Sequence, residues 1–251
     1  MKKILLTNDD GIRSMGILSL MESLSEEYDV FTVAPSTEKS AVSMALTLNS
    51  PLRVNKLREN FYSVDGTPSD CVNIAMRKLV KKKPDIVISG MNMGENLSED
   101  ILYSGTVGGA FSGFLYDVPA LAVSMISDKD SYSRGKYDFE SSAEIVKDVA
   151  RKLLSLSGLK GIYNMNIPYK NNKKVIVTSL GNKRYKPDII ERTDPRGKKY
   201  YWIGTGNPTS TGKRGSDIWA VKNGYISLSP LRFNLNCFES SLKLEGIFDE
   251  I

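Results

Sequence analysis

Two adjacent carboxylates near the amino terminus carry the strongest chemical signal in this sequence. Asp9 and Asp10 follow the apolar run Ile4-Leu5-Leu6 and precede Gly11. An apolar run that ends in turn residues is typical of a central strand in a parallel sheet, and ligands bind beyond the carboxyl ends of such strands. Two carboxylates at that edge repel each other and lose hydration unless a cation lies between them. A solvated acidic turn is the alternative interpretation of this segment taken alone.

Two later loops offer further oxygen ligands. Residues 35–43 and 90–96 each follow a predicted strand, so they should meet residues 8–11 at one edge of the sheet. Together the three loops supply carboxylates, hydroxyls and carboxamides. The chain contains no histidine, which excludes a Ser-His-Asp triad and a histidine-ligated zinc site. An all-oxygen ligand set favours a hard cation such as Mg²⁺ or Mn²⁺.

A third signal is the segment Ser104-Gly105-Thr106 at the start of a predicted helix. Hydroxyls and unpaired amides at a helix N-terminus favour an anion. The alternative is a helix that packs closely through its small residues. A cation beside an anion site indicates phosphoryl chemistry, because a metal polarises a phosphate and lowers the pKa of bound water, and an Asp could orient that water or accept its proton.

The elements expected around these loops alternate between strands and helices. A helix with Ile17, Leu20, Met21 and Leu24 on one face joins two strands, which predicts a βαβ unit. Thr67, Pro68 and Asp70 have the spacing of a capped helix start. The expected strands cover residues 4–6, 28–34, 85–89 and 121–124, a long helix covers 139–156, and irregular strands cover 45–65 with a hairpin at 49–51.

The pattern changes near residue 161. Short strand-like runs at residues 163–167, 174–179, 200–204 and 225–229 alternate with polar turns, and residues 183–199 form either an extended arm or a flexible loop. The predicted fold class is therefore α/β: a doubly wound, mostly parallel, Rossmann-like sheet with a β-rich C-terminal extension used in oligomerisation. We expect one domain over residues 1–251, with a catalytic core at 1–160 and an extension at 161–251 exchanged between subunits.

Composition and charge argue against a nucleic-acid-binding protein, a cysteine-ligated metal site and a membrane protein. The net charge of +5 comes from 34 basic and 29 acidic residues in 251, and the basic cluster Lys81-Lys82-Lys83 fits a solvated helix end. Nucleic-acid binding is therefore not expected. Cys71 and Cys237 match no metal or redox motif, and Cys71 is expected in the core. The apolar N-terminal run is too short for a signal peptide, and no membrane span is expected, which predicts a cytoplasmic protein.

Several motifs, in order and at this spacing, resemble those of the survival protein E (SurE) family of 5′-nucleotidases. The resemblance covers nearly the whole chain, and the Asn-Asp-Asp-Gly and Ser-Gly-x-Asn-x-Gly-x-Asn motifs are highly specific in combination. The matching segments are Thr7-Asn-Asp-Asp-Gly11, Val33-Ala-Pro35 with Ser40, Gly66-Thr-Pro-Ser-Asp-Cys71, Ser89-Gly-Met-Asn-Met-Gly-Glu-Asn96, Tyr103-Ser-Gly-Thr-Val107, Asn164-Met-Asn-Ile-Pro168, Leu180-Gly181, Tyr200-Tyr-Trp-Ile-Gly204 and Gly224-Tyr-Ile-Ser227.

The resemblance implies a reaction and a set of site residues. The expected reaction is hydrolysis of nucleoside 5′-monophosphates, with 3′-monophosphates and short polyphosphate as further candidate substrates. It implies one divalent cation per subunit, Mg²⁺ or Mn²⁺, in a cytoplasmic homodimer or tetramer. The implied catalytic residues are Asp9 and Asp10; the implied metal ligands are Asp9, Asp10, Ser40 and Asn92; the implied phosphate-binding residues are Asn96, Ser104, Gly105 and Thr106.

The sequence also departs from the family. After Pro35 the family usually has an acidic and then a basic residue, where this chain has Ser36 and Thr37, and residues 41–45 are more apolar than usual. The four metal ligands are retained, so the reaction carries over while the nucleotide preference does not.

Three alternatives belong to other classes. A non-catalytic nucleotide- or RNA-binding protein using the mildly basic surface predicts salt-sensitive binding without turnover. A receiver-like domain also has an acidic pair after its first strand but requires a later phosphoacceptor Asp and about half this length. A two-carboxylate glycosyltransferase predicts hydrolysis of sugar nucleotides.

Overall fold

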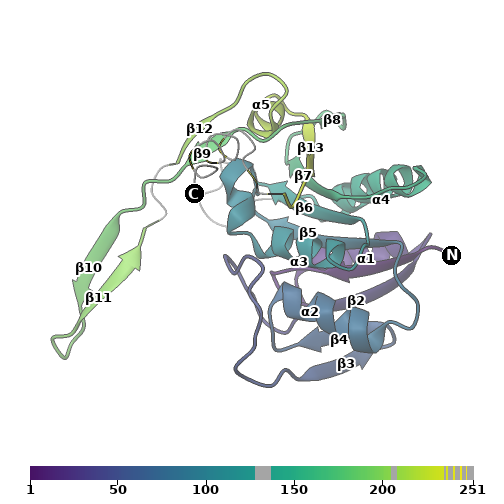
Figure 1. The fold of residues 1–251 in the computed structure, drawn as a ribbon, viewed down its shortest axis with the longest axis horizontal. Coiled ribbons are helices and arrows are strands. Elements are labelled where there is room, and N and C mark those ends of the chain that lie inside the picture. The colour runs from purple at the N-terminus through teal and green to yellow at the C-terminus, as the bar shows by residue number, and fades with distance from the viewer. Residues whose placement is uncertain are drawn as a thin grey trace.

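The fold is organised around one nine-stranded sheet. The computed structural model describes residues 1–127, 137–204 and 208–234 and the single positions 236, 240, 244 and 247. Strand order is β3-β4-β2-β1-β5-β6-β7-β13-β8, with β1 between β2 and β5 (Figure 1). The strands of this sheet are β1 (Lys3–Thr7), β2 (Asp29–Pro35), β3 (Val54–Arg58), β4 (Phe61–Val64), β5 (Ile86–Met93), β6 (Ala120–Ile126), β7 (Ile162–Pro168), β8 (Val175–Val177) and β13 (Ile226–Leu231).

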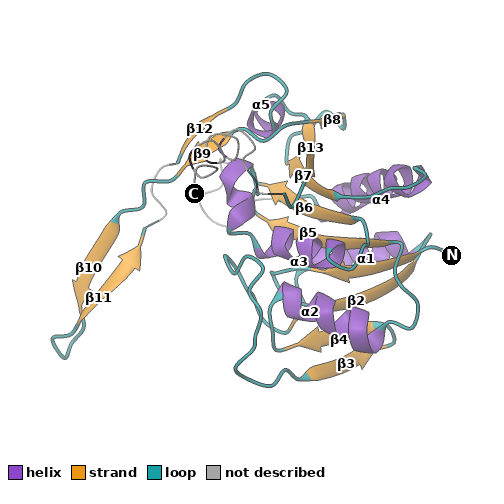
Figure 2. Cartoon of the chain, in the orientation of Figure 1, coloured by secondary structure: helices purple, strands orange, loops and turns teal. Residues whose placement is uncertain are grey.

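The sheet is mostly parallel, as the sequence predicts. The neighbours from β4 through β7 are all parallel, whereas β3 pairs antiparallel with β4 and β13 pairs antiparallel with β7. Helices cover both faces (Figure 2). The helices are α1 (Met15–Ser25), α2 (Pro68–Ile74), α3 (Gly105–Phe114), α4 (Phe139–Ser155) and α5 (Asp217–Lys222), with short η1 (Ala75–Leu79) and η2 (Ser98–Leu102).

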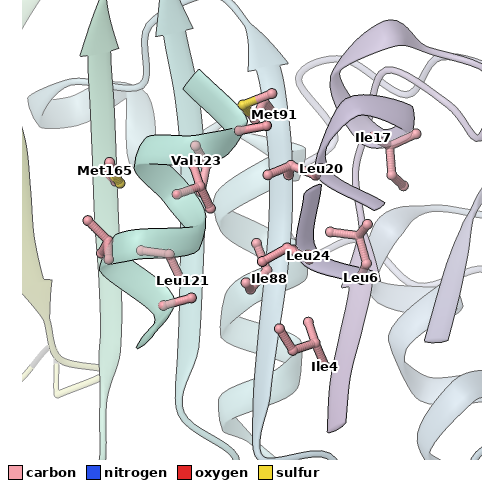
Figure 3. Packing of buried hydrophobic residues seen from close by; sticks show 14 of the residues in the cluster. Ile4, Leu6, Ile17, Leu20, Leu24, Ile88, Met91, Leu121, Val123 and Met165 are labelled. Carbon is pink, nitrogen blue, oxygen red and sulfur yellow. The ribbon is translucent and has the colours of Figure 1, made fainter. Parts of the chain in front are cut away.

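Each face of the sheet has its own core. In β1, Ile4 and Leu6 belong to the cluster beneath α1 and α4, whereas Leu5 belongs to the cluster beneath α2 and α3. This alternation follows from the two-residue period of a strand. Figure 3 shows Leu20 and Leu24 of α1 beside Leu6 and Ile88 in the first cluster. The doubly wound α/β class is confirmed.

Local helix signals are also confirmed. Thr67 Oγ1 accepts a hydrogen bond from Asp70 N (3.1 Å), and Asp70 Oδ2 accepts one from Thr67 N (2.9 Å), which is the reciprocal cap expected for α2. Cys71 is fully buried in the core, and Cys237 lies outside the described residues.

The hairpin position predicted near residues 49–51 is wrong. The hairpin joins β3 to β4 and turns at Asn60, which has φ of +53°. Asn tolerates this left-handed conformation better than most residues, so it can close a tight turn. Residues 49–51 form only a bend that leads into β3.

The C-terminal part contributes both to the sheet and to a projecting arm. The runs predicted at 163–167, 174–179 and 225–229 correspond to β7, β8 and β13, so the sheet continues across residue 160. β10 (Ile189–Thr193) and β11 (Lys199–Ile203) pair antiparallel and project from the body (Figure 1). Residues 183–199 therefore contain an arm and not a flexible loop. The short strands β9 (Asn182–Arg184) and β12 (Thr209–Thr211) pair at its base.

No helix in the described part of the chain is long and apolar enough to cross a membrane.

Candidate active site

The three predicted loops meet around one cavity at the carboxyl ends of β1, β2 and β5. Its volume is about 760 Å³. Six of the residues that the sequence analysis selected line it: Asp9, Asp10, Ser40, Asn92, Asn96 and Ser104. Gly105 and Thr106 lie directly behind Asp9. The structure therefore brings all eight selected residues together, although their roles toward a metal or a phosphate stay predictions.

Asp9 is held in one orientation by the start of α3. Its Oδ2 accepts a hydrogen bond from Thr106 N (2.9 Å), and its Oδ1 accepts one from Thr106 Oγ1. Gly105 permits this approach, because a Cβ at Gly105 would lie 2.9 Å from Asp9 Cβ. Asp9 is almost fully buried, and burial raises its pKa although the Thr106 hydrogen bonds oppose that effect. The start of α3 therefore fixes the orientation of the Asp9 carboxylate. Its hydrogen bonds also offset part of the free-energy cost of holding that carboxylate ionised in a buried position.

Asp10 is the more accessible of the two carboxylates. Its Oδ2 accepts a hydrogen bond from Met93 N at the end of β5 (3.1 Å). Burial, together with the negative charge of Asp9, raises the pKa of Asp10 to about 6. Two adjacent carboxylates whose pKa values are both raised form a place where a cation would stabilise the charged forms.

Ser40 and Asn92 follow the acidic pair at distant positions in sequence, and both line the same cavity. Ser40 Oγ donates a hydrogen bond to Glu38 Oε1 (2.6 Å) on the exposed loop after β2. Asn92 Nδ2 donates to Gly94 O (2.8 Å), which leaves its carboxamide oxygen as the atom that can face a ligand. Both residues can therefore add oxygen ligands to those of the two aspartates.

These residues fit a hard divalent cation. Two carboxylates, a hydroxyl and a carboxamide oxygen suit Mg²⁺ or Mn²⁺. Within the described residues no three side chains drawn from Cys, Asp and Glu gather as a metal site. Ser40 and Asn92 are the neutral oxygen donors that the cavity offers in addition to the acidic pair.

Asn96 and Ser104 form the wall beside the acidic pair. The Asn96 backbone N donates to Asn166 Oδ1 (2.9 Å), and its side-chain Nδ2 donates to Ser124 Oγ (2.7 Å), so the residue is anchored to β6 and β7. Ser104 Oγ accepts from Val107 N (3.1 Å) and caps α3.

Part of the expected anion site is already engaged within the protein. The amides of Thr106 and Val107 are bonded to Asp9 and Ser104, and the hydroxyl of fully buried Thr106 is bonded to Asp9. Thr106 therefore supports the metal side of the cavity in this structure, and a direct contact with phosphate stays a prediction.

Sequence reasoning missed other residues of the cavity wall. These are Glu38, Met93, Glu95, Asp100, Tyr103, Tyr185, Pro187, Ile203 and Gly204, whereas Ala41 belongs to the apolar segment 41–45 that the sequence analysis singled out. Glu95 and Tyr103 lie inside or beside motifs already noted, so their position offered a signal. Ile203 and Gly204 end the motif at residues 200–204, whereas nothing in the local pattern of Tyr185 and Pro187 points to a cavity formed by residues 9–104.

Comparison with known proteins shows the family of this chain. The family model of survival protein SurE matches residues 4–187. The chain belongs to the SurE family. It is 42% identical over 248 residues to the 5′-nucleotidase SurE of Geotalea uraniireducens (strain Rf4), covering 97% of this chain and 98% of that protein. It is 44% identical over 239 residues to the 5′-nucleotidase SurE of Thermoanaerobacter sp. (strain X514), covering 93% of each chain.

A solved structure shows the same architecture. The crystal structure of the SurE protein from Aquifex aeolicus matches with a TM-score of 0.81 and 37% sequence identity, over 98% of this chain and 99% of that chain. The SurE fold therefore extends over the sheet, the cavity and the C-terminal elements together.

Proposed function

We propose that this SurE-family protein is a 5′-nucleotidase, a phosphoric monoester hydrolase that converts nucleoside 5′-monophosphates to nucleoside and inorganic phosphate. The observation that carries the proposal is the placement of Asp9 and Asp10 with Ser40, Asn92 and the start of α3 around one cavity. The 5′-nucleotidase relatives that align over nearly the full chain support it.

A divalent cation, Mg²⁺ or Mn²⁺, one per subunit, is part of this proposal. Asp9, Asp10, Ser40 and Asn92 would hold it. When bound, such an ion polarises a phosphoryl group and lowers the pKa of a bound water.

The residues of the chain then have distinct tasks. Asp9, fixed by Thr106, keeps its carboxylate in one direction, which limits the reorganisation needed during reaction. Asp10 is the better placed proton acceptor of the pair because it is the less buried of the two and lines the open cavity. Asn96 and the Ser104-Gly105-Thr106 helix start would lie against the phosphate oxygens.

The attacking group defines two versions of the mechanism. In the first, a water oxygen bonds to phosphorus as the ester oxygen leaves, and Asp10 accepts the proton of that water. In the second, an Asp carboxylate oxygen bonds to phosphorus as the ester oxygen leaves, and water then hydrolyses the aspartyl phosphate to release inorganic phosphate and the carboxylate. Acid quenching of a single turnover with a ³²P-labelled monophosphate separates them, because only the second version leaves the label covalently bound to the protein as an aspartyl phosphate.

We further propose a homodimer or tetramer in which the C-terminal region is exchanged. The arm exposes apolar side chains from both of its strands, including Ile189, Trp202 and Ile203. Exposed apolar surface of this kind marks a protein–protein contact. Light scattering after size exclusion gives the molar mass, and a monomer at micromolar concentration would contradict the proposal. The cytoplasmic location expected from the sequence stays a prediction.

Phosphate release from a substrate panel tests the function. The panel contains 5′-monophosphates with four bases, the matching 3′-monophosphates and short polyphosphate, each with chelator, Mg²⁺ or Mn²⁺. We expect metal-dependent phosphate release from the 5′-monophosphates. The rates of release from the 3′-monophosphates and from polyphosphate show which of them are further substrates. Nucleotide binding without release under any metal would favour the non-catalytic nucleotide- or RNA-binding alternative.

A further inference from the structure

We propose that Lys183 is a positioning residue of the active site: its ammonium balances Glu95 and Asp100 on the cavity wall and fixes the segment that carries Asn96 and Ser104, so that a phosphate dianion can bind there. This inference rests on the proposed function, because it assumes a phosphorylated substrate in the cavity.

The cavity wall carries several negative charges, which disfavour the binding of a phosphate dianion. Among the residues that the structure describes, five carboxylates line it: Asp9, Asp10, Glu38, Glu95 and Asp100. None of the described residues that line it is a lysine or an arginine. A phosphate monoester carries close to two negative charges at neutral pH, so five carboxylates would repel it. A divalent cation between Asp9 and Asp10 compensates those two, but Glu95 and Asp100 lie on another part of the wall and need a separate cation.

Lys183 is that cation. Its Nζ lies 2.7 Å from Glu95 Oε1 and 2.6 Å from Asp100 Oδ2, and its side chain is only 6% exposed. Burial disfavours the charged ammonium, but the hydrogen bonds to Asp100 and Glu95 outweigh burial and raise the pKa of Lys183 above its ordinary value. Lys183 is therefore charged throughout the range in which a nucleotidase would work.

The same contacts fix the segment between the two proposed phosphate ligands. Asp100 Oδ2 also accepts from Leu97 N (3.1 Å), and Asp100 O accepts from Ser104 N (3.1 Å). Tyr185 adds a hydrogen bond from its hydroxyl to Asp100 Oδ1 (2.5 Å). Loss of the Lys183 ammonium would thus leave the charge of Asp100 uncompensated and its side chain held only by Leu97 N and the Tyr185 hydroxyl, next to Ser104.

A second buried carboxylate joins the same two segments. Asp217 has no exposed surface, and its Oδ2 accepts from Ser98 N (2.8 Å) while its Oδ1 accepts from Gly181 N (2.7 Å). Residues 95–104 and residues 181–185 therefore form one bonded unit. Within this unit, Lys183 carries the positive charge that offsets the negative charges of Glu95 and Asp100 on the cavity wall.

Lys147 provides a matched control. It is equally buried, with a side chain 7% exposed, and it also pairs with two carboxylates, Glu26 at 2.6 Å and Glu144 at 2.9 Å. It lies on α4 and does not line the cavity. Lys147→Met removes a lysine with a similarly covered side chain, but its partners Glu26 and Glu144 are 63% and 56% exposed, so its folding penalty is the smaller of the two and it controls for the loss of a paired lysine away from the cavity.

The test compares Lys183→Met, Lys183→Arg and Lys147→Met in the metal-loaded enzyme. We expect Lys183→Met to raise both KM for a nucleoside monophosphate and the inhibition constant for inorganic phosphate by about tenfold or more, with a smaller loss in kcat. Lys183→Arg keeps the charge and should stay within about threefold of wild type. Lys147→Met should leave both constants unchanged. Equal changes in Lys183→Met and Lys147→Met would overturn the proposal.

Glu95→Gln tests the charge argument in the opposite direction and with less risk to folding, because Glu95 is one-third exposed. Removal of this negative charge should lower the inhibition constant for phosphate by about two- to threefold. A higher inhibition constant, or an unchanged one, contradicts the charge-balancing role even if Lys183→Met does not fold.

Limited proteolysis separates this proposal from the proposed function. Leu102 and Tyr103 are exposed at the end of η2, so chymotrypsin reports on this segment in the metal-free protein without substrate. We expect Lys183→Met to be cleaved there at least several-fold faster than Lys147→Met. If wild type hydrolyses no nucleotide but this difference is found, only the proposed function fails; equal cleavage rates refute the positioning role itself.

Discussion

Asp10→Asn should stabilise the metal-free protein at neutral pH. Burial and the charge of Asp9 raise the pKa of Asp10 from 3.8 to about 6, so ionised Asp10 opposes folding. The substitution removes this charge and keeps an oxygen that can accept the hydrogen bond from Met93 N. Asparagine should therefore be better tolerated than aspartate wherever the folded protein would hold a charged Asp10.

The magnitude and the pH range follow from the same two pKa values. The difference between 3.8 and about 6 corresponds to about 3 kcal/mol at roughly 1.4 kcal/mol per pKa unit. Because Asp10 is only partly buried and water screens its charge, we expect about 1–2 kcal/mol. A carboxyl group whose pKa is higher in the folded than in the unfolded state contributes to the stability of the folded state. That contribution is complete at pH values below the unfolded-state pKa and is lost as pH rises through the folded-state pKa. The advantage of Asp10→Asn should therefore be absent below pH 4, grow between pH 4 and 6, and stay constant above.

Thermal and urea unfolding in the presence of EDTA measure this effect. A gain of 1–2 kcal/mol corresponds to roughly 2–8 °C in Tm for a chain of this size. Saturating Mg²⁺ or Mn²⁺ should reverse the order, because a ligand that binds the folded state stabilises wild type more than a variant lacking one of its ligands. A variant that is less stable than wild type at pH 7.5 in EDTA, or a difference independent of pH, would refute the electrostatic account of the acidic pair.

Two further predictions concern the helix start behind Asp9. Gly105→Ala places a Cβ 2.9 Å from Asp9 Cβ and should cost about 1–3 kcal/mol of unfolding free energy and lower kcat/KM at least tenfold; wild-type metal affinity and activity in this variant would show that the close approach is unimportant. Thr106→Val removes the hydroxyl bonded to Asp9 Oδ1 and should weaken Mn²⁺ binding by about tenfold in calorimetric titration, whereas an unchanged affinity would mean that Thr106 does not position Asp9.

The sequence predicts those parts of the fold that are determined by residues close to one another in the chain. The apolar run before Asp9 becomes β1, and the Thr67 to Asp70 spacing becomes the cap of α2, because each depends on residues within one turn or one strand. The strand order also explains why Asn92 lies at the same cavity as Asp9, since the ends of parallel strands meet at one sheet edge.

The parts that were missed depend on contacts far apart in sequence. Lys183 pairs with Asp100 across 83 residues and with Glu95 across 88, and its own surroundings are polar, so nothing local distinguishes it from a solvated lysine. The hairpin at Asn60 was misplaced because two turn signals compete within residues 45–65, and only the pairing of β4 with β2 selects between them. Local sequence patterns predict single helices and strands. The charge balance of the cavity depends on side chains that are far apart in sequence, so local patterns do not predict it.

The most direct test of the account is AMP hydrolysis by wild type and Asp9→Asn, with Asp148→Asn, an exposed position on α4, as the matched control. With Mg²⁺ or Mn²⁺, we predict phosphate release by wild type and Asp148→Asn, a loss of at least a hundredfold in kcat/KM for Asp9→Asn, and no release by any of them in EDTA. Release by wild type that persists in EDTA, or an Asp9→Asn variant as active as Asp148→Asn, would contradict a metal-dependent phosphatase site at the acidic pair.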